Sequence, residues 1–216
     1  MKSPNASYIP AVDHVRAIAA ILVILHHVHI HVGGRLFFGY PEKYWTTAAT
    51  PFDAMIVDGH TGVALFMVLS GFIFTTIALG KRIDYLPFLV NRVLRIFPLL
   101  FFLFALAWLF RPDQVGVKEL LAVVFIPFAL VSPVDFWHVP EIHPFTALFW
   151  TIAPEFKFYF LFPFLLLAVG RWGLRALLVI GLAWMVLRFA LGVAGADPQQ
   201  LAYYTIFGRL DQFLLG

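Results

Sequence analysis

The chain has 216 residues, of which 62% are hydrophobic and only 12% are charged. This composition lies far outside the average of soluble globular domains, so the lipid bilayer is the natural solvent for the chain. The net charge of +3 is too small to form a phosphate-binding stripe, which argues against a nucleic-acid partner. Cysteine is absent, which excludes disulfides, thiolate metal sites and acyl-cysteine chemistry.

Six apolar runs follow one another along the chain, and a seventh begins near Tyr204. The six are Val12 to Val32, Val57 to Leu79, Val93 to Phe110, Val117 to Val131, Thr146 to Val169 and Ala176 to Val193. Because a spanning helix needs about 20 mainly apolar residues, the pattern predicts an all-α, polytopic transmembrane bundle of about six helices plus the start of a seventh. We expect a single membrane-embedded domain over residues 1–216, incomplete at its C-terminal end because the seventh run stops before it crosses the hydrocarbon.

Basic residues give two conflicting indications of topology. The positive-inside rule places the stretch KRIDYLPFLVNRVLR (residues 81–95) in the cytoplasm, and the N-terminus with it. The same rule places RWGLR (residues 171–175) inside, although three apolar runs separate the two stretches. Either the short run Val117 to Val131 is re-entrant or strongly tilted, or the second basic stretch faces outward.

The first apolar run carries ionisable residues that share one helical face. An α-helix turns by about 100° per residue, so Arg16 and His27 lie within about 20° of one another and Asp13 within about 40° of His27. His26 points about 100° away from this face. Ionisable groups inside a membrane cost several kcal/mol unless they face a polar interior, which favours a functional site. The structural alternative is an ion pair of Asp13 with Arg16 at the headgroup level and a histidine bonded to a neighbouring helix.

We predict no metal site. His27 and His31 have the i, i+4 spacing of metal ligands. The glutamate of H-E-x-x-H is missing and no thiol is available, so the spacing alone does not predict a metal.

A second polar island lies in the middle of an aromatic helix. Glu155 has Thr151 and Tyr159 one turn to either side on the same face. Pro154 is expected to break the helix there, because it removes a backbone donor. The structural alternative to a functional carboxylate is an ion pair with Lys157 or an arginine, although Lys157 points roughly opposite Glu155.

Two further patterns have competing structural explanations. Arg92 and Arg95 are spaced i, i+3, so they can bind a phosphate together or anchor a helix at the interface. Ser70 and Gly71 favour close helix packing. The nucleophile motif G-x-S-x-G is absent, so a serine nucleophile is not supported.

Five stretches, taken in order, resemble the acyltransferase 3 family of integral-membrane O-acyltransferases. They are VDHVRAIAAILVILHH (residues 12–27), GVALFMVLSGF (62–72), NRVLRIFP (91–98), FWTIAPEFKFYFLFP (149–163) and GRLDQFLLG (208–216). The resemblance implies a bundle of about ten transmembrane helices, of which this chain supplies the first six and the start of the seventh. It also implies transfer of an acyl group, usually acetyl from acetyl-CoA, to a hydroxyl of a surface glycan or lipid-linked sugar.

The resemblance also implies residue roles. His27 stands where the family has its candidate catalytic histidine, and we predict it to be the general base, with an acyl-histidine intermediate as the alternative. Glu155 and Asp13 complete the predicted catalytic set, in which Glu155 orients or charge-stabilises His27. Three arginines match family positions associated with activity or with the acyl-CoA donor, namely Arg16, Arg92 and Arg95. No metal cofactor is expected, and the expected location is the plasma membrane.

Two other functions compete with this interpretation. The main rival is a proton-coupled transporter or flippase in which His27, Glu155 and Arg16 form an ion relay. The other is a structural membrane fragment without activity.

Overall fold

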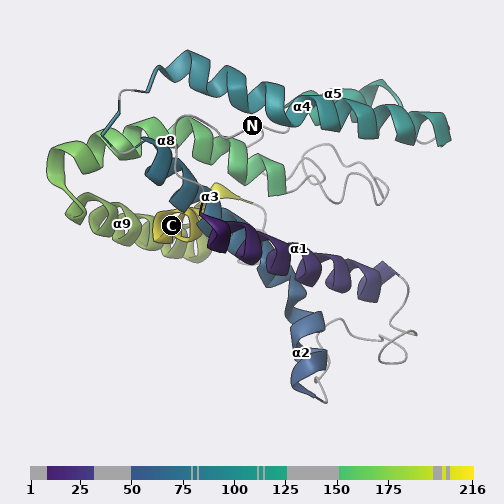
Figure 1. Ribbon diagram of the computed structural model, residues 1–216, viewed down its shortest axis with the longest axis horizontal. Coiled ribbons are helices and arrows are strands. Elements are labelled where there is room, and N and C mark those ends of the chain that lie inside the picture. The colour runs from purple at the N-terminus through teal and green to yellow at the C-terminus, as the bar shows by residue number, and fades with distance from the viewer. Residues whose placement is uncertain are drawn as a thin grey trace. The chain divides into compact units, whose positions relative to one another are not determined.

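A computed structural model of the chain is shown in Figure 1. It describes residues 9–31, 50–78, 80–81, 83–110, 112–113, 115–125, 151–196, 201–202 and 205–216. Every regular element within these ranges is a helix. Among the described residues, five helical stretches are long and apolar enough to span a membrane, and they are Pro10–Val28, Pro51–Ala78, Tyr85–Phe110, Ile152–Trp172 and Arg175–Val193. The predicted all-α, polytopic membrane architecture is therefore confirmed.

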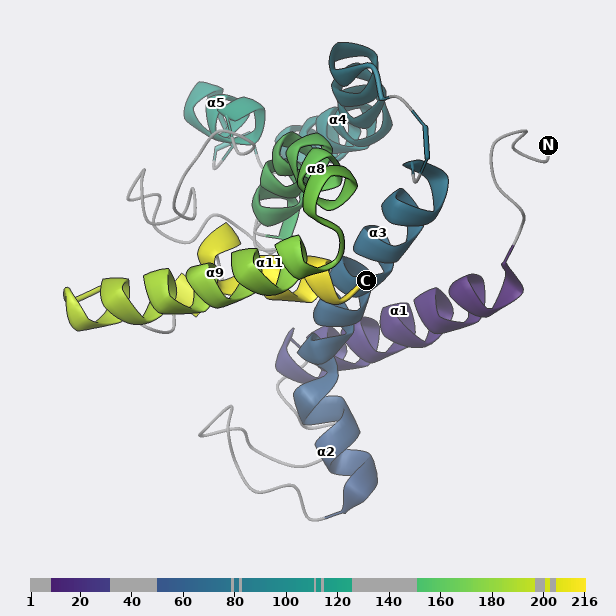
Figure 2. The same ribbon diagram turned by 90° about the vertical axis from the view of Figure 1, so that its left-hand side faces the viewer.

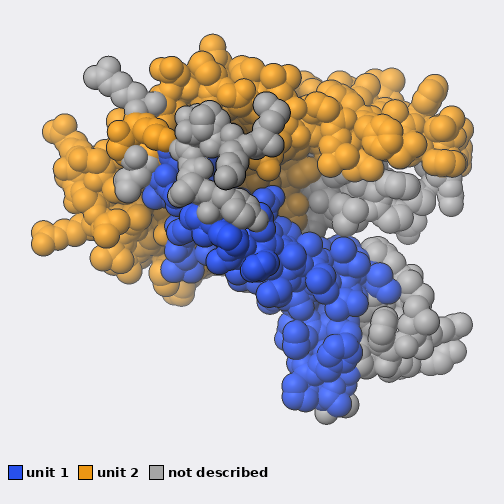
Figure 3. All heavy atoms as spheres, in the orientation of Figure 1, with its two compact units in different colours: residues 1–77, 215–216 blue, residues 78–214 orange. Residues whose placement is uncertain are grey.

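The chain divides into two compact units (Figure 3). The first comprises residues 1–77 with 215–216, and the second comprises residues 78–214. The first unit contains α1 (Pro10–His31), α2 (Pro51–Val57), the 3-10 turn η1 (Asp58–His60) and α3 (Thr61–Ala78). The second contains α4 (Tyr85–Phe110), α5 (Val117–Phe125), α8 (Ile152–Trp172), α9 (Arg175–Val193) and α11 (Ile206–Leu215).

The second spanning stretch begins earlier than its apolar run, because a capping box starts α2. The Thr50 hydroxyl accepts a hydrogen bond from the Asp53 amide at 3.2 Å, and the Asp53 carboxylate accepts one from the Thr50 amide at 2.9 Å. Pro51 occupies the first helical position, where its missing N–H leaves no helical bond unmade. From there α2, η1 and α3 follow one another without a loop.

Helix α1 crosses this second stretch (Figure 2), and two glycines permit the close approach. A Cβ atom at Gly62 would lie only 2.5 Å from the Ala19 carbonyl oxygen and 2.9 Å from Val23 Cγ2. One at Gly59 would lie 2.4 Å from the Leu22 carbonyl oxygen and 3.0 Å from the Cβ of His26. Any side chain at either position would push the two backbones apart, so the crossing of α1 depends on glycine.

In the second unit, α4 and α8 pack through a small apolar core. Leu100 and Ala153 are buried, and partly buried apolar side chains of both helices surround them, namely Ile96, Leu103, Phe104 and Ile152. The ring of Phe158 on α8 stacks on that of Phe213 on α11, with ring centroids 4.1 Å apart. These contacts fix α8, the helix that carries Glu155, against two neighbours.

Large apolar side chains cover the outward surfaces of the long helices. Ile24 on α1 is 59% exposed, Leu167 on α8 is 70% exposed and Phe189 on α9 is 75% exposed. Apolar surface of this extent is unusual in a water-soluble monomer and is normal for helices that face lipid. The exposed faces thus agree with the membrane assignment.

The structure corrects one detail of the sequence interpretation. Helix α8 begins at Ile152, so Pro154 lies in its first turn and does not break it. A backbone N–H in the first turn has no partner within the helix, and proline is therefore tolerated there. Glu155 belongs to this first turn as well and is not in the middle of the helix.

Some of the sequence predictions fall outside the described residues. The run Val117 to Val131 is described only as far as Phe125, so the choice between a re-entrant and an outward-facing arrangement stays a prediction. Trp150, part of the fourth stretch of the family resemblance, also lies outside them.

Candidate active site

Asp13 and Arg16 form an ion pair at the start of α1. The Arg16 guanidinium lies 3.8 Å from the Asp13 carboxylate, and both side chains are about half exposed. Eleven residues of α-helix, a rise of about 16 Å, separate Arg16 from His27. The helical face predicted to carry ionisable residues therefore has a charged pair at one end of α1 and His27 towards the other end. The side chain of His31 lies outside the described residues.

A backbone carbonyl of its own helix holds His27. The imidazole Nδ1 lies 2.7 Å from the carbonyl oxygen of Val23, one turn earlier in α1. A carbonyl can only accept, so Nδ1 carries the proton and donates it. In the neutral ring Nε2 then carries the lone pair, which is the form that a general base requires.

His26 contacts both His27 and a third histidine, His60, and the sequence did not predict a role for either His26 or His60. The ring centroid of His26 lies 5.7 Å from that of His27 and 5.2 Å from that of His60. His26 Nδ1 also lies 3.3 Å from the carbonyl oxygen of Ile56. On a helical wheel, His26 points about 100° away from the face that Arg16 and His27 share. A helical wheel of α1 cannot reveal that the crossing at Gly59 places η1 next to it.

Glu155 on α8 is held by a tyrosine. The Tyr159 hydroxyl donates a hydrogen bond to Glu155 Oε1, so the predicted common face of these two residues is confirmed. Tyr159 is buried at 3% exposure, and its ring contacts those of Phe88, Phe156 and Phe158. Aromatic packing thus fixes the hydroxyl that orients the carboxylate.

Arg92 on α4 belongs to the same group. Its guanidinium lies 5.5 Å from the centroid of the Phe88 ring, a cation–π contact. Its charge also acts on Glu155 and on Tyr159, and the charge of Arg95 acts on Tyr159. Arg92 and Arg95 on α4 and Glu155 on α8 therefore lie on two helices that pack against each other.

Lys157 does not pair with Glu155 in the part of the chain that the structure describes. Its ammonium nitrogen is buried, and among these residues no acceptor lies within hydrogen-bond distance. This agrees with the opposite orientation of the two side chains on the helical wheel. Within the described ranges, Glu155 is thus an oriented carboxylate bonded by Tyr159 and not half of a Glu–Lys ion pair.

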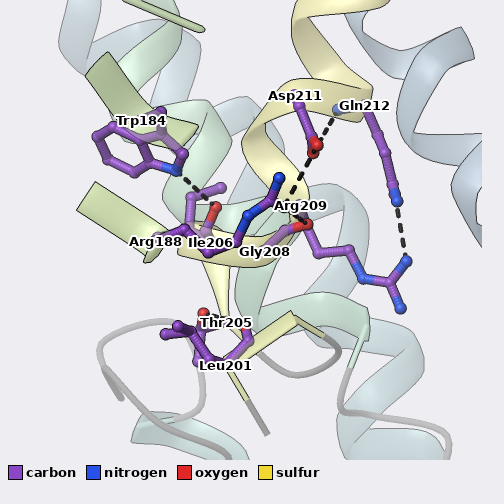
Figure 4. A network of polar contacts seen from close by, with 9 residues as sticks. All are labelled: Trp184, Arg188, Leu201, Thr205, Ile206, Gly208, Arg209, Asp211 and Gln212. Carbon is purple, nitrogen blue, oxygen red and sulfur yellow. Dashed lines mark hydrogen bonds and ion pairs between the residues drawn. The ribbon is translucent and has the colours of Figure 1, made fainter. Parts of the chain in front are cut away.

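The GRLDQFLLG stretch (residues 208–216) forms most of α11 and is bonded to α9 (Figure 4). Arg188 on α9 donates to the Asp211 carboxylate and to the Gly208 carbonyl, both at 3.3 Å. Trp184 Nε1 donates to the Ile206 carbonyl at 3.2 Å, and Arg209 donates to the Gln212 side chain at 3.3 Å. The bonds of Arg188 and Trp184 fix α11 on α9, whereas the bond between Arg209 and Gln212 lies within α11.

The cluster of histidines in the first unit raises the question of a metal site. Three imidazoles approach one another in the first unit, yet across the described ranges no group of three histidine or carboxylate side chains has the geometry to hold a metal ion. The predicted pairing of His27 with Glu155 would join the two units, and it stays a prediction.

Comparisons with known proteins agree with the resemblance. The family model described as an acyltransferase domain matches residues 9–210. O-acetyltransferase OatA of Staphylococcus aureus (strain NCTC 8325 / PS 47) is 25% identical, with 100% of this chain and 34% of that protein covered. Peptidoglycan O-acetyltransferase OatA of Listeria monocytogenes is 25% identical over 93% of this chain and 32% of its own length.

A third relative is the putative peptidoglycan O-acetyltransferase YrhL of Bacillus subtilis (strain 168), which is 26% identical over 100% of this chain and 33% of its own length. The chain thus spans about a third of the length of the curated relatives that it matches. No solved structure matches it.

Proposed function

The chain belongs to the acyltransferase 3 family, and from this premise we propose that it is part of a membrane O-acyltransferase. The acyl group, most simply acetyl, is carried by acyl-CoA and passes to a hydroxyl of a cell-surface glycan or a lipid-linked sugar. Peptidoglycan is the first acceptor to test, because two of the relatives above are named for it. The observation that supports the reaction most directly is the hydrogen bond between His27 Nδ1 and the Val23 carbonyl.

In this proposal His27 is the general base. The acceptor hydroxyl attacks the thioester carbonyl while Nε2 of His27 takes the hydroxyl proton. The new C–O bond forms, the C–S bond breaks, and His27 returns the proton to the departing sulfur of CoA. A covalent acyl-histidine is the alternative route, in which Nε2 itself attacks the thioester.

The charged residues have complementary proposed roles. Glu155, held by the Tyr159 hydroxyl, stabilises the imidazolium that forms on His27. Two arginines of α4, Arg92 and Arg95, bind the CoA phosphates, because guanidinium groups form strong paired bonds to phosphate oxygens. Asp13 orients the Arg16 guanidinium, which polarises the thioester or binds the pyrophosphate.

The location follows from the donor. Acyl-CoA is a cytoplasmic metabolite and the acceptor is on the outside, so the enzyme belongs in the plasma membrane. The basic stretch at residues 81–95 and the N-terminus then face the cytoplasm. The polar face of α1 lines a passage that brings the thioester to His27, which explains why a membrane helix carries ionisable residues.

A thioester assay on the full-length protein tests the proposal. Membranes that carry the protein receive acetyl-CoA and glycan acceptors, and the loss of thioester is compared between wild type and His27→Ala. His14→Ala is the matched control, because His14 lies on the same helix with an exposed side chain. We expect acceptor-dependent loss in wild type and in the control, and no such loss in His27→Ala.

Two results would overturn the proposal. One is full activity of His27→Ala. The other is movement of a glycan precursor across vesicle membranes in the absence of acyl-CoA, together with no thioester loss for any acceptor. The second result would favour the transporter, with His27, Glu155 and Arg16 as an ion relay.

A further inference from the structure

His26 occupies the centre of three imidazoles at the crossing of α1 with η1. Its ring lies edge-on to that of His27, at an interplanar angle of 88°, and tilted by 54° to that of His60. It therefore connects the proposed base to a residue outside α1. His26 and His60 have no part in the reaction described above.

A different helix fixes each of the two neighbouring rings on α1. His27 bonds to Val23 of its own helix, whereas His26 Nδ1 donates across 30 positions of sequence to the carbonyl of Ile56 on α2. Ile56 is 1% exposed, so this carbonyl belongs to a well-packed part of α2. The His26 ring is thereby fixed relative to the second spanning stretch.

The close crossing of α1 and η1 restricts the position of the His26 side chain, and so favours its hydrogen bond to the Ile56 carbonyl. Position 59 has room only for glycine, because a Cβ atom there would lie 2.4 Å from the Leu22 carbonyl oxygen and 3.0 Å from the Cβ of His26. The start of the His26 side chain therefore lies against the η1 backbone, and its ring has little freedom to move away. His60, on η1 itself, contacts the other side of that ring.

We propose that His26 is a positioning residue for His27, and that its hydrogen bond to the Ile56 carbonyl is what gives it this role. The Val23 bond fixes one nitrogen of His27, and the His26 side chain, held in place by its hydrogen bond to the Ile56 carbonyl, limits the direction in which Nε2 points. His60 supports His26 from η1. This inference rests on the proposed role of His27 as the base.

The expected consequence is kinetic. A base that is displaced by a fraction of an ångström still permits donor binding but transfers the proton poorly, so kcat falls while KM for acetyl-CoA stays nearly constant. A merely structural role would instead lower the number of folded, donor-binding molecules. The rate per acetyl-CoA-binding site separates the two.

Two substitutions separate the hydrogen bond from the ring. In His26→Asn the side-chain amide nitrogen takes the place of Nδ1 and can still donate to the Ile56 carbonyl. In His26→Phe the ring remains and the donor is lost. Both are measured in the full-length protein, with the rate normalised to the number of acetyl-CoA-binding sites and with His14→Ala as control.

We expect His26→Phe to lose about 10- to 100-fold in kcat, within the range that small displacements of catalytic groups produce. His26→Asn should stay within about threefold of wild type, and neither should change KM more than about twofold. Wild-type kcat in His26→Phe, or an equal loss in His26→Asn and His26→Phe, would overturn the inference. His60→Phe should lower kcat less than His26→Phe, and a larger loss would also contradict it.

These outcomes are distinct from failure of the proposed function. If His27→Ala is inactive and His26→Phe is fully active, His27 remains the base and only the positioning role is wrong. If His27→Ala is fully active, the proposed function itself is wrong, whatever the His26 variants do.

Discussion

His27 on α1 and Glu155 on α8 are both partly buried ionisable side chains on apolar helices, yet they are held in different ways. The backbone of its own helix holds His27, through the carbonyl of Val23. A buried side chain, the hydroxyl of Tyr159, holds Glu155, and three neighbouring aromatic rings hold Tyr159. The orientation of His27 thus depends first on helix geometry, and that of Glu155 on aromatic packing.

This difference determines which substitutions affect each group. A change in the packing around α8 should disturb Glu155, because it moves the hydroxyl that bonds the carboxylate. The acceptor of the His27 bond, the Val23 carbonyl, keeps its position for as long as α1 is helical. Packing affects His27 in two ways, through the close crossing of α1 at Gly59 and Gly62 and through the contact of the His27 ring with that of His26.

The largest expected effect is on the crossing of α1. Gly62→Leu would place a side chain where the Ala19 carbonyl and Val23 Cγ2 lie. We expect the free energy of unfolding to fall by about 3 kcal/mol, as for a strongly overpacked position. Thermal unfolding in detergent measures the change.

Gly170→Leu is the control, because a Cβ atom at Gly170 meets nothing within 4 Å. Its stability should stay within about 0.5 kcal/mol of wild type. Equal melting temperatures for Gly62→Leu and Gly170→Leu would show that the crossing is not tightly packed.

The next effect separates the two ionisable groups. Tyr159→Phe keeps the aromatic ring and removes the donor to Glu155, so a partly buried carboxylate loses a hydrogen bond. We expect a loss of about 1.5–3 kcal/mol in stability, together with reduced acyl transfer. Unfolding in detergent and the thioester assay on the full-length protein are the two measurements.

Tyr85→Phe is the matched control. Tyr85 is 39% exposed and its hydroxyl lies 3.5 Å from the Phe160 carbonyl, a long contact that should contribute little. Equal stability losses in the two variants would contradict the special role of the hydrogen bond between Tyr159 and Glu155.

A smaller effect is expected at the link between α9 and α11. Arg188 and Asp211 are 3.3 Å apart, with side chains 30% and 41% exposed. A double-mutant cycle with Arg188→Ala and Asp211→Ala should give a coupling energy of about 0.5–1 kcal/mol. The same cycle with the exposed Arg175 in place of Arg188 should give no coupling, and coupling of equal size there would contradict the assignment.

The smallest effect on stability is expected at the start of α1. Asp13 and Arg16 are about half exposed and 3.8 Å apart, so Asp13→Asn should change stability by less than about 0.5 kcal/mol. Acyl transfer should nevertheless fall, because Asp13 orients Arg16 in the proposed site. Unchanged transfer in a stable Asp13→Asn protein would remove Asp13 from that site.

The parts of this account that the sequence predicted depend on local geometry. The apolar runs predicted the spanning helices, and the spacing of Glu155 and Tyr159 by one turn predicted their contact. The paired arginines of α4 were also identified from their spacing. Each of these depends only on the 3.6-residue helical period or on the length of a run.

The parts that the sequence did not predict depend on contacts between segments. The bond from His26 to Ile56 and the ion pair of Arg188 with Asp211 join residues 30 and 23 positions apart. A periodicity within one helix carries no information about which neighbour it meets. The position of Glu155 in the first turn of α8 was not predicted for a related reason, because the hydrophobicity of an aromatic stretch does not mark the residue at which its helix begins.

The most direct test of the central claim, that His27 is the base, is a single-turnover measurement on the full-length protein. Acetyl-CoA is bound to wild type and to His27→Ala, its dissociation constant is determined, and the rate of acetyl transfer to a glycan acceptor is followed for the bound donor. The account predicts the same dissociation constant within about threefold and a rate about 10²- to 10⁴-fold lower in His27→Ala. An unchanged rate at full donor occupancy would contradict it.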